Sequence, residues 1–425
     1  MIERVELFQT KKDLFLLFTL FLTLLSFSLS YEYYKYYQLT KFDSALIKAK
    51  VQKQYLKTKI TKTGKEKTYQ LLQLKSFDGF TFYTTAKKNF QDVKGEELEL
   101  EIFIDNLSFY QYMKSFFAFS RILQVTTTNS NKEDLKSLIA IQHQNKIYSE
   151  IYEALYLATP LPKELQTTFS NLGLSHLIAI SGFHLGIISA LLFFLLKYPY
   201  KFFQNNYFPY RNHTRDIFII ISFVLLFYTL FLDTPPSLLR AYVMLVIGFL
   251  LYDRGIKIIS MQTLFLTVLL IIAVFPRLFF SIGFWLSVAG VGYIFLFLIY
   301  FQEYKKLWQF LLLPLFVYLM MLPYSLTIFG NFSFLHPLSI IYTMLFTVFY
   351  PLTLLLHVFG FGGVFDPLLE ALMATGSEGV KILLDIKILE VFIIISLGSI
   401  LNRYLFFTLN LFAFFIFIYA INNVT

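Results

Sequence analysis

The sequence of 425 residues contains no cysteine. This absence excludes disulfide bonds, zinc sites built on thiolates and catalysis by a cysteine nucleophile. Charged residues are also scarce, at 15% of the chain, against roughly a quarter in an average soluble domain. Hydrophobic residues reach 57% and the mean hydropathy is +0.62, so we expect an α-helical polytopic membrane protein.

The sequence also lacks the short motifs that power or catalyse common reactions. It contains no HExxH zinc motif and no Walker-type phosphate loop, so it offers no site at which ATP would drive transport. We therefore predict no catalytic set, no metal site and no cofactor. The net charge of +9 does not by itself indicate nucleic-acid binding, because cytoplasmic loops of membrane proteins are rich in Lys and Arg.

Long apolar runs predict about ten membrane spans. The loop 197–215 carries Lys and Arg but no acidic residue, so the positive-inside rule places it in the cytoplasm. The N-terminus falls on the same side, which makes the segment after the first span extracytoplasmic. We expect a multi-pass membrane protein, with spans near residues 14–30, 178–196, 216–232, 237–252, 258–274, 278–300, 307–322, 337–358, 388–401 and 404–420.

The central stretch, residues 171–196, combines a span with a polar beginning. Its part from about 178 onward has no Asp, Glu, Lys or Arg. Ionisable groups in or beside a span are costly, so those that occur are functional candidates. A glycine there lets another backbone or a substrate approach closely. The candidates in this stretch are His176, Ser181, Gly182 and His184.

Residues 43–106 change to the period of two that is typical of half-buried strands. Asp78–Gly79 is a hairpin-turn sequence, and about five short strands predict a small OB-like barrel. Lysines and aromatic rings on such a barrel can follow a phosphate backbone and stack on bases, although an ordinary solvated surface is the alternative. The predicted DNA-capture residues are Lys57, Lys59, Lys62, Lys65, Lys67, Phe80, Phe82 and Tyr83.

The sequence divides into four parts. An uncleaved membrane anchor with an aromatic belt occupies residues 1–42, because no A-x-A-like site follows its apolar run. The OB-like barrel follows at 43–106. Interfacial and amphipathic helices are predicted for 107–170, and the polytopic domain for 171–425.

Three further blocks place polar or small residues in spans. Arg240 lies about one turn inside an apolar helix that two prolines begin, and an arginine at that depth requires an anion, a carboxylate or water. Pairing with Asp233 or extension to the interface are the structural alternatives. The second block, residues 283–287, has small residues that would allow close helix packing. The third, residues 323–331, is a polar connection between spans that breaks the helical pattern. The candidates in these blocks are Pro236, Ser237, Arg240, Gly283, Ser287 and Asn331.

Two other functions fit parts of this pattern. Ser181 and His184 would share a helical face, as in an intramembrane serine hydrolase, but no third orienting group or oxyanion hole is visible. His176 and His184 would lie roughly 12 Å apart along a continuous helix, too far to share a metal. A secondary transporter or flippase that reads an anionic substrate through Arg240 is the second alternative.

The order of these blocks resembles the ComEC-type competence family of inner-membrane DNA-uptake channels. The similar segments are 173–184, 236–241, 283–287 and 323–331, after an N-terminal OB-like barrel. The resemblance implies a non-enzymatic channel that passes one DNA strand into the cytoplasm. Its predicted DNA path comprises His176, Ser181, Gly182, His184, Pro236, Ser237, Arg240, Gly283, Ser287 and Asn331.

The resemblance also implies binding partners, and this sequence departs from the family pattern in two places. Single-stranded DNA, a periplasmic DNA receptor, a cytoplasmic DNA motor, single-strand-binding proteins and membrane lipid are expected, and a homodimer is left open. Many members carry a metallo-β-lactamase-like domain, which we expect to be missing here, so that any nuclease for the non-entering strand is absent or supplied by another protein. Residues 157–162 lack the Gly-Asp pair of the family, which leaves the role of that position open.

Overall fold

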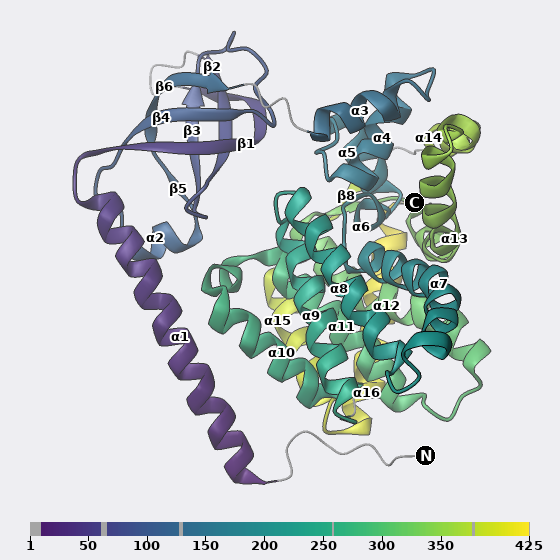
Figure 1. Cartoon of the computed structure of the whole chain (residues 1–425). Coiled ribbons are helices and arrows are strands. Elements are labelled where there is room, and N and C mark those ends of the chain that lie inside the picture. Colours follow the sequence, from purple (N-terminus) through teal and green to yellow (C-terminus); the bar gives the residue numbers. More distant parts are fainter. Residues whose placement is uncertain (1–9, 61–65, 127–130, 257–258, 376–378, 425) are drawn as a thin grey trace. The chain divides into compact units, whose positions relative to one another are not determined.

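The computed structural model describes residues 10–60, 66–126, 131–256, 259–375 and 379–424 (Figure 1). The chain forms two compact units, and both are discontinuous in sequence. One unit, the sheet unit, comprises residues 14–134 and 270–281. The other, the helical unit, comprises residues 1–13, 135–269 and 282–425.

The sheet unit contains a six-stranded sheet with the order β5-β3-β2-β1-β4-β6. Neighbouring strands are antiparallel except for β3 and β5, which run parallel. The two strands at the ends of this order, β5 and β6, are separated in sequence only by Ala118. The strands are β1 (Ser44–Ile60), β2 (Glu66–Ser76), β3 (Thr81–Ala86), β4 (Glu97–Phe103), β5 (Phe116–Phe117) and β6 (Phe119–Thr126).

Alternation along the strands builds the core of the sheet unit. Ile47, Ala49 and Val51 of β1 are buried, while the intervening lysines are not. The predicted turn is confirmed, because Gly79 adopts a φ of 94° and its N–H donates to the Ser76 carbonyl at 2.9 Å. The β1–β2 pair continues past the positions where β3 and β4 pair with it, and forms a two-stranded arm of residues 57–60 and 66–69.

The first helix, α1 (Lys11–Thr40), packs on this core through its second half. Leu39 is buried in the core, and the Tyr36 hydroxyl donates to the Leu107 carbonyl at 2.7 Å. The connection η1 (Pro276–Phe280) belongs to the same unit: Arg277 pairs with Glu32 of α1 at 2.6 Å and donates to the Tyr112 carbonyl at 3.1 Å. Two segments that are 245 positions apart in sequence thus meet in one partly buried contact.

The prediction of interfacial helix over 107–125 is wrong for most of that segment. Only α2 (Phe109–Lys114) is helical, and Ser108 begins it with a capping box. Residues 116–126 are strands, because Phe116 and Ala118 enter the core while the backbone pairs with β3 and β4. The sheet therefore extends to Thr126 rather than ending at residue 106.

The helical unit begins with short helices and continues with long apolar ones. Its described elements include the two-stranded pair β7 (Asn331–Phe332) with β8 (Val380–Lys381) and the 3-10 turns η2 (His336–Leu338) and η3 (Gly362–Phe365). The helices are α3 (Asn131–Ala140), α4 (Lys146–Leu157), α5 (Lys163–Asn171), α6 (Ser175–Ile178), α7 (Gly182–Tyr207), α8 (His213–Phe231), α9 (Pro236–Asp253), α10 (Met261–Val274), α11 (Ile282–Tyr300), α12 (Lys306–Ile328), α13 (Ser339–Val358), α14 (Asp366–Ala374), α15 (Ile386–Gly398) and α16 (Arg403–Asn422).

The helical membrane architecture is confirmed. Among the described residues, seven helical segments are long and apolar enough to cross a bilayer: Lys11–Thr40, Gly182–Tyr207, His213–Phe231, Ile282–Tyr300, Lys306–Ile328, His336–Val358 and Arg403–Asn422. The other three predicted spans coincide with α9, α10 and α15, which have 18, 14 and 13 residues. Since a bilayer core of about 30 Å requires about 20 helical residues, the count of ten stays a prediction.

Candidate functional site

The central stretch breaks at the position where its polar residues lie. The helix α6 ends at Ile178, Ala179 is extended with ψ 124°, and α7 begins at Gly182. The predicted interruption at the start of this span is therefore present. Irregular backbone at membrane depth is tolerated only where it is buried in protein or borders a cavity.

Ser181 and His184 form a capping box rather than an isolated catalytic pair. The Ser181 hydroxyl accepts from the Phe183 N–H at 3.3 Å, and the Ser181 N–H donates to His184 Nδ1 at 3.3 Å. The serine hydroxyl also lies 3.2 Å from His184 Nδ1. This contact is explained by the start of the helix, so it supplies no support for a hydrolase.

His184 itself is completely buried against α13. Its ring lies 5.2 Å from that of Phe346 and 4.7 Å from that of Tyr350. Because Nδ1 accepts a backbone N–H, a neutral His184 has its proton on Nε2, and within the described parts of the chain this atom has no hydrogen-bond partner. A triad base would instead be oriented by a carboxylate.

The start of α9 packs directly on the break in the central stretch. The Ser237 hydroxyl donates to the Ile180 carbonyl at 2.8 Å. A Cβ at Gly182 would lie 3.1 Å from that of Ala241, so the glycine is what allows these helices to approach. Pro236 is the first residue of α9, and its side chain lies outside the described part of the structure.

Arg240 connects α9 with α11. Its side chain is 5% exposed, its guanidinium donates to the Gly283 carbonyl, and the guanidinium carbon lies 5.7 Å from the centre of the Phe284 ring. A buried arginine is stabilised by such a carbonyl and an aromatic face. Ser287 lies one turn further along α11 and is half-buried.

The connection after α12 contacts the other side of the central stretch. The Asn331 amide donates to the Ser170 hydroxyl at 2.9 Å. Gly173 has a φ of 72°, and a Cβ there would lie only 2.9–3.0 Å from the His336 ring. His176 is exposed and contacts the Thr343 hydroxyl through Nε2 at 3.2 Å.

The structure thus brings the four predicted blocks together in one chain of contacts. Segment 173–184 touches the beginning of α9, α9 touches α11 through Arg240, and the connection 331–336 lies against residues 170–173. Two hollows of about 480 and 430 Å³ lie elsewhere in the helical unit, and neither is lined by a predicted path residue.

The predicted DNA-capture residues differ in exposure: two are buried, one is half-buried, two are exposed and the side chains of three lie outside the described residues. Phe80 and Phe82 are 1% and 0% exposed, so the prediction that they stack on bases is wrong in this structure: they alternate inward and form the core of the sheet. Tyr83 is half-buried, and Lys57 and Lys67 are exposed on the arm. Lys62, Lys65 and the Lys59 side chain lie outside the described residues.

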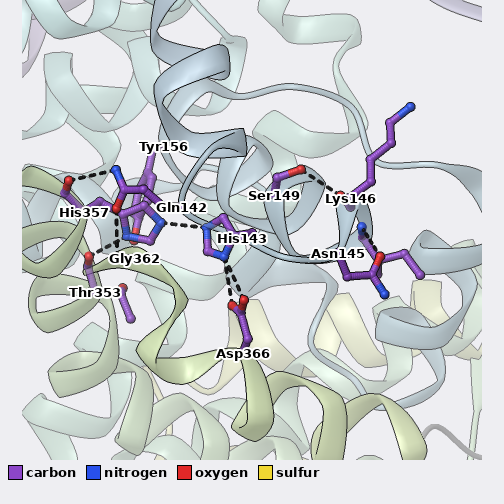
Figure 2. Close-up of polar contacts among 11 residues, drawn as sticks. Gln142, His143, Asn145, Lys146, Ser149, Tyr156, Thr353, His357, Gly362 and Asp366 are labelled. Atoms are coloured by element: carbon purple, nitrogen blue, oxygen red, sulfur yellow. Dashed lines mark hydrogen bonds and ion pairs between the residues drawn. The ribbon is translucent and has the colours of Figure 1, made fainter. Parts of the chain in front are cut away.

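A polar cluster that the sequence analysis missed connects α3 and α4 with α13 and α14 (Figure 2). His143 lies between Asp366 and His357, and Gln142 accepts from the Gly362 N–H at 2.8 Å. The only signal in the sequence was one histidine and one aspartate among apolar residues, at 357 and 366, since His143 lies in a polar stretch. Within the described residues, no group of three His, Cys, Asp or Glu side chains is arranged to hold a metal.

Comparison with known proteins supports the order of the blocks. The sequence model of the family described as "Competence protein" matches residues 158–421, which contain all four blocks. A protein of Aquifex aeolicus (strain VF5), named "Uncharacterized protein", is 27% identical over 295 residues, or 63% of this chain. The chain spans 65% of the length of that curated relative. No solved structure matches the chain.

Proposed function

Because the chain belongs to the competence protein family, we propose that it is a membrane channel that passes single-stranded DNA into the cytoplasm during natural transformation. Membership in the family supports a role in DNA uptake. The observation that carries the step from uptake to passage is the chain of contacts that connects the four polar blocks, one of which includes the break between α6 and α7.

The chemistry of these blocks suits a strand that must move. DNA is a polyanion, so it crosses a membrane only along a hydrated path lined with polar groups, and too many strong charges would trap it. The ten proposed path residues contain one permanent cation, Arg240, beside serines, histidines, glycines and an asparagine. Arg240 would contact the phosphates after exchanging its carbonyl partner for them.

We further propose that the sheet is an OB-like barrel on the extracytoplasmic side. Its strand order fits this fold, since the segment 116–126 pairs with both β3 and β4 through β5 and β6. Lys57 and Lys67 on the arm, with Lys59, Lys62 and Lys65 between them in the sequence, would gather the strand electrostatically. Such capture weakens as the salt concentration rises.

The remaining parts of the proposal concern location and partners. The protein would lie in the bacterial inner membrane and receive DNA from a periplasmic receptor. A cytoplasmic motor would pull the strand, because no nucleotide motif is recognisable in this sequence, and single-strand-binding proteins would receive it. A homodimer remains an open part of the proposal.

The function is tested by a strain in which this gene is deleted. With labelled double-stranded DNA, we expect surface-bound DNA to stay at the parental level, while DNA that resists added nuclease and reaches the cytoplasm disappears. Restoring the gene from a plasmid should restore entry. Unchanged DNA entry in the deletion strain would contradict the proposal. If the strain instead kept DNA entry and lost uptake of a small anion, the alternative of a secondary transporter would be favoured.

Cysteine labelling tests whether the blocks border water. The chain has no native cysteine, so Ser181→Cys and Ser237→Cys each introduce a single thiol. We expect both to react with a small charged thiol reagent in cells that take up DNA, because only a hydrated thiolate reacts readily.

Ile220→Cys is the matched control for this labelling. Ile220 is 41% exposed on the apolar helix α8 and should remain unlabelled, because its surroundings would be lipid. If Ser181→Cys and Ser237→Cys were sealed in every state while an exposed Lys57→Cys reacted, no DNA would pass this way.

A further inference from the structure

Three side chains from distant parts of the sequence form a continuous hydrogen-bonded row in the helical unit (Figure 2). His143 follows α3, and its Nδ1 lies 2.9 and 3.0 Å from the two carboxylate oxygens of Asp366, the first residue of α14. Its Nε2 lies 3.0 Å from Nε2 of His357, near the end of α13. The His143 side chain is 0% exposed and that of Asp366 is 13% exposed.

The contacts fix where the protons must be. His357 Nδ1 lies 2.7 Å from the Thr353 carbonyl, which can only accept, so this nitrogen carries a proton. A neutral His357 then has a bare Nε2, and the 3.0 Å contact requires His143 Nε2 to donate. His143 Nδ1 faces a carboxylate and donates as well. Both nitrogens of His143 are therefore protonated when Asp366 is ionised and His357 is neutral.

We propose that Asp366, His143 and His357 form a proton-binding site that locks α3 and α4 onto α13 and α14. The site holds one proton between Asp366 and His143, and both contacts of His143 can form together only when it is present. Removing this proton leaves either two lone pairs facing each other between the histidines or a lone pair facing the carboxylate. Adding a second proton, on His357, sets two N–H groups against each other.

The neighbouring titratable groups do not supply the proton that the row holds. The Tyr152 ring stacks on His143 at 4.8 Å, and burial, with a smaller contribution from the Asp366 carboxylate, raises the pKa of Tyr152 above its usual range, so its hydroxyl stays neutral. Tyr156 adds a second hydroxyl, 3.4 Å from His357 Nδ1. The other charged groups on α4 and α14 are Lys146 and Glu150, which pair at 3.8 Å, together with Glu153 and Glu370.

The lock reaches the central stretch through one helix. The helix α13 carries His357 near its end, Phe346 and Tyr350 against His184, and Thr343 against His176. Backbone contacts reinforce the connection, because the Gln142 amide donates to the His357 carbonyl at 3.1 Å. Opening the row would weaken the attachment of α4 to α13, which the apolar contact between Tyr156 and Tyr350 would then maintain without the polar contacts.

The number of protons in the row decides whether the lock is closed. It is closed when the row holds one proton and open when it holds none or two, because the facing nitrogens of the two histidines then no longer pair as donor and acceptor. This inference goes beyond DNA passage and does not depend on it.

Nitrogen-15 NMR of the full chain in detergent tests the inference. The chain has only six histidines, so ring-labelled histidine gives six spin systems. At neutral pH we expect one imidazolium, which is lost in His143→Gln, and one neutral histidine protonated on Nδ1, which is lost in His357→Gln. Free histidine prefers the other neutral tautomer, so this second pattern is diagnostic.

Two further variants test the role of the carboxylate and provide a control histidine. Asp366→Asn should convert the imidazolium of His143 to a neutral ring while the protein remains folded, whereas His213→Gln, at the start of α8, should leave both patterns unchanged. In parallel, hydrogen exchange of residues 146–157 in the parent should be slowest at the pH values where the NMR spectrum shows the His143 imidazolium, and this protection should be lost in Asp366→Asn. Two neutral rings protonated on Nε2, or an unchanged His143 ring in Asp366→Asn, would overturn the proposal.

Discussion

Replacing Arg240 with alanine should reduce DNA entry about 100-fold and leave surface-bound DNA unchanged. The substitution removes the cation of the proposed path and leaves the Gly283 carbonyl without the guanidinium donor of the buried Arg240. A lost hydrogen bond to a charged group costs about 1.5–3 kcal/mol, and each 1.4 kcal/mol is about a factor of ten. The measurement is nuclease-resistant labelled DNA per cell, normalised to the amount of protein in the membrane.

Two other arginine variants give this experiment its controls. Arg254→Ala removes a cation from the exposed end of the same helix and should leave entry unchanged. Arg240→Lys keeps the charge but loses the planar fork, so it should recover part of the entry. Normal entry in Arg240→Ala, at normal protein levels, would remove this residue from the path.

The second large effect is expected at Gly173. Gly173→Ala should lower the free energy of unfolding by about 3 kcal/mol, because the residue has a left-handed φ of 72° and the new Cβ would meet the His336 ring at 2.9–3.0 Å. The thermal midpoint of the purified protein in detergent, followed by the loss of tertiary structure, measures this change.

Gly186→Ala is the matched control, since it adds the same methyl group in the neighbouring helix. No atom lies within 4 Å of the added Cβ there, and alanine favours a helix, so stability should rise by about 0.5–1 kcal/mol. Equal midpoints for the two variants would show that the contact of Gly173 with His336 is not needed for folding.

The sequence predicted the helical architecture and much of the site because the responsible signals are local. A run without charge identifies a span, and a serine before an apolar run identifies the start of α7. Arg240 is recognisable since a buried arginine is rare in an apolar helix. The ordered blocks then identified the family, which the match over residues 158–421 confirms.

Other features could not be predicted because they depend on distant partners. Phe80 and Phe82 alternate with neighbours on a strand, but which face is buried is decided by the sheet that forms around them. The aromatic segment 116–126 resembles an interfacial helix until β3 and β4 provide backbone partners for it. The row of His143, His357 and Asp366 joins residues more than 200 positions apart and leaves no periodic pattern.

The contact between Glu32 and Arg277 has a consequence for the order of biosynthesis. The ribosome delivers the sheet and the first helix early, yet the arginine that neutralises Glu32 and the Phe280 ring that packs on Tyr110 arrive only after α7 to α10 have been made. Until then, the nascent sheet unit lacks the charge partner of a carboxylate that is 14% exposed in the finished protein. Completion of the N-terminal part therefore waits for membrane insertion of the middle of the chain.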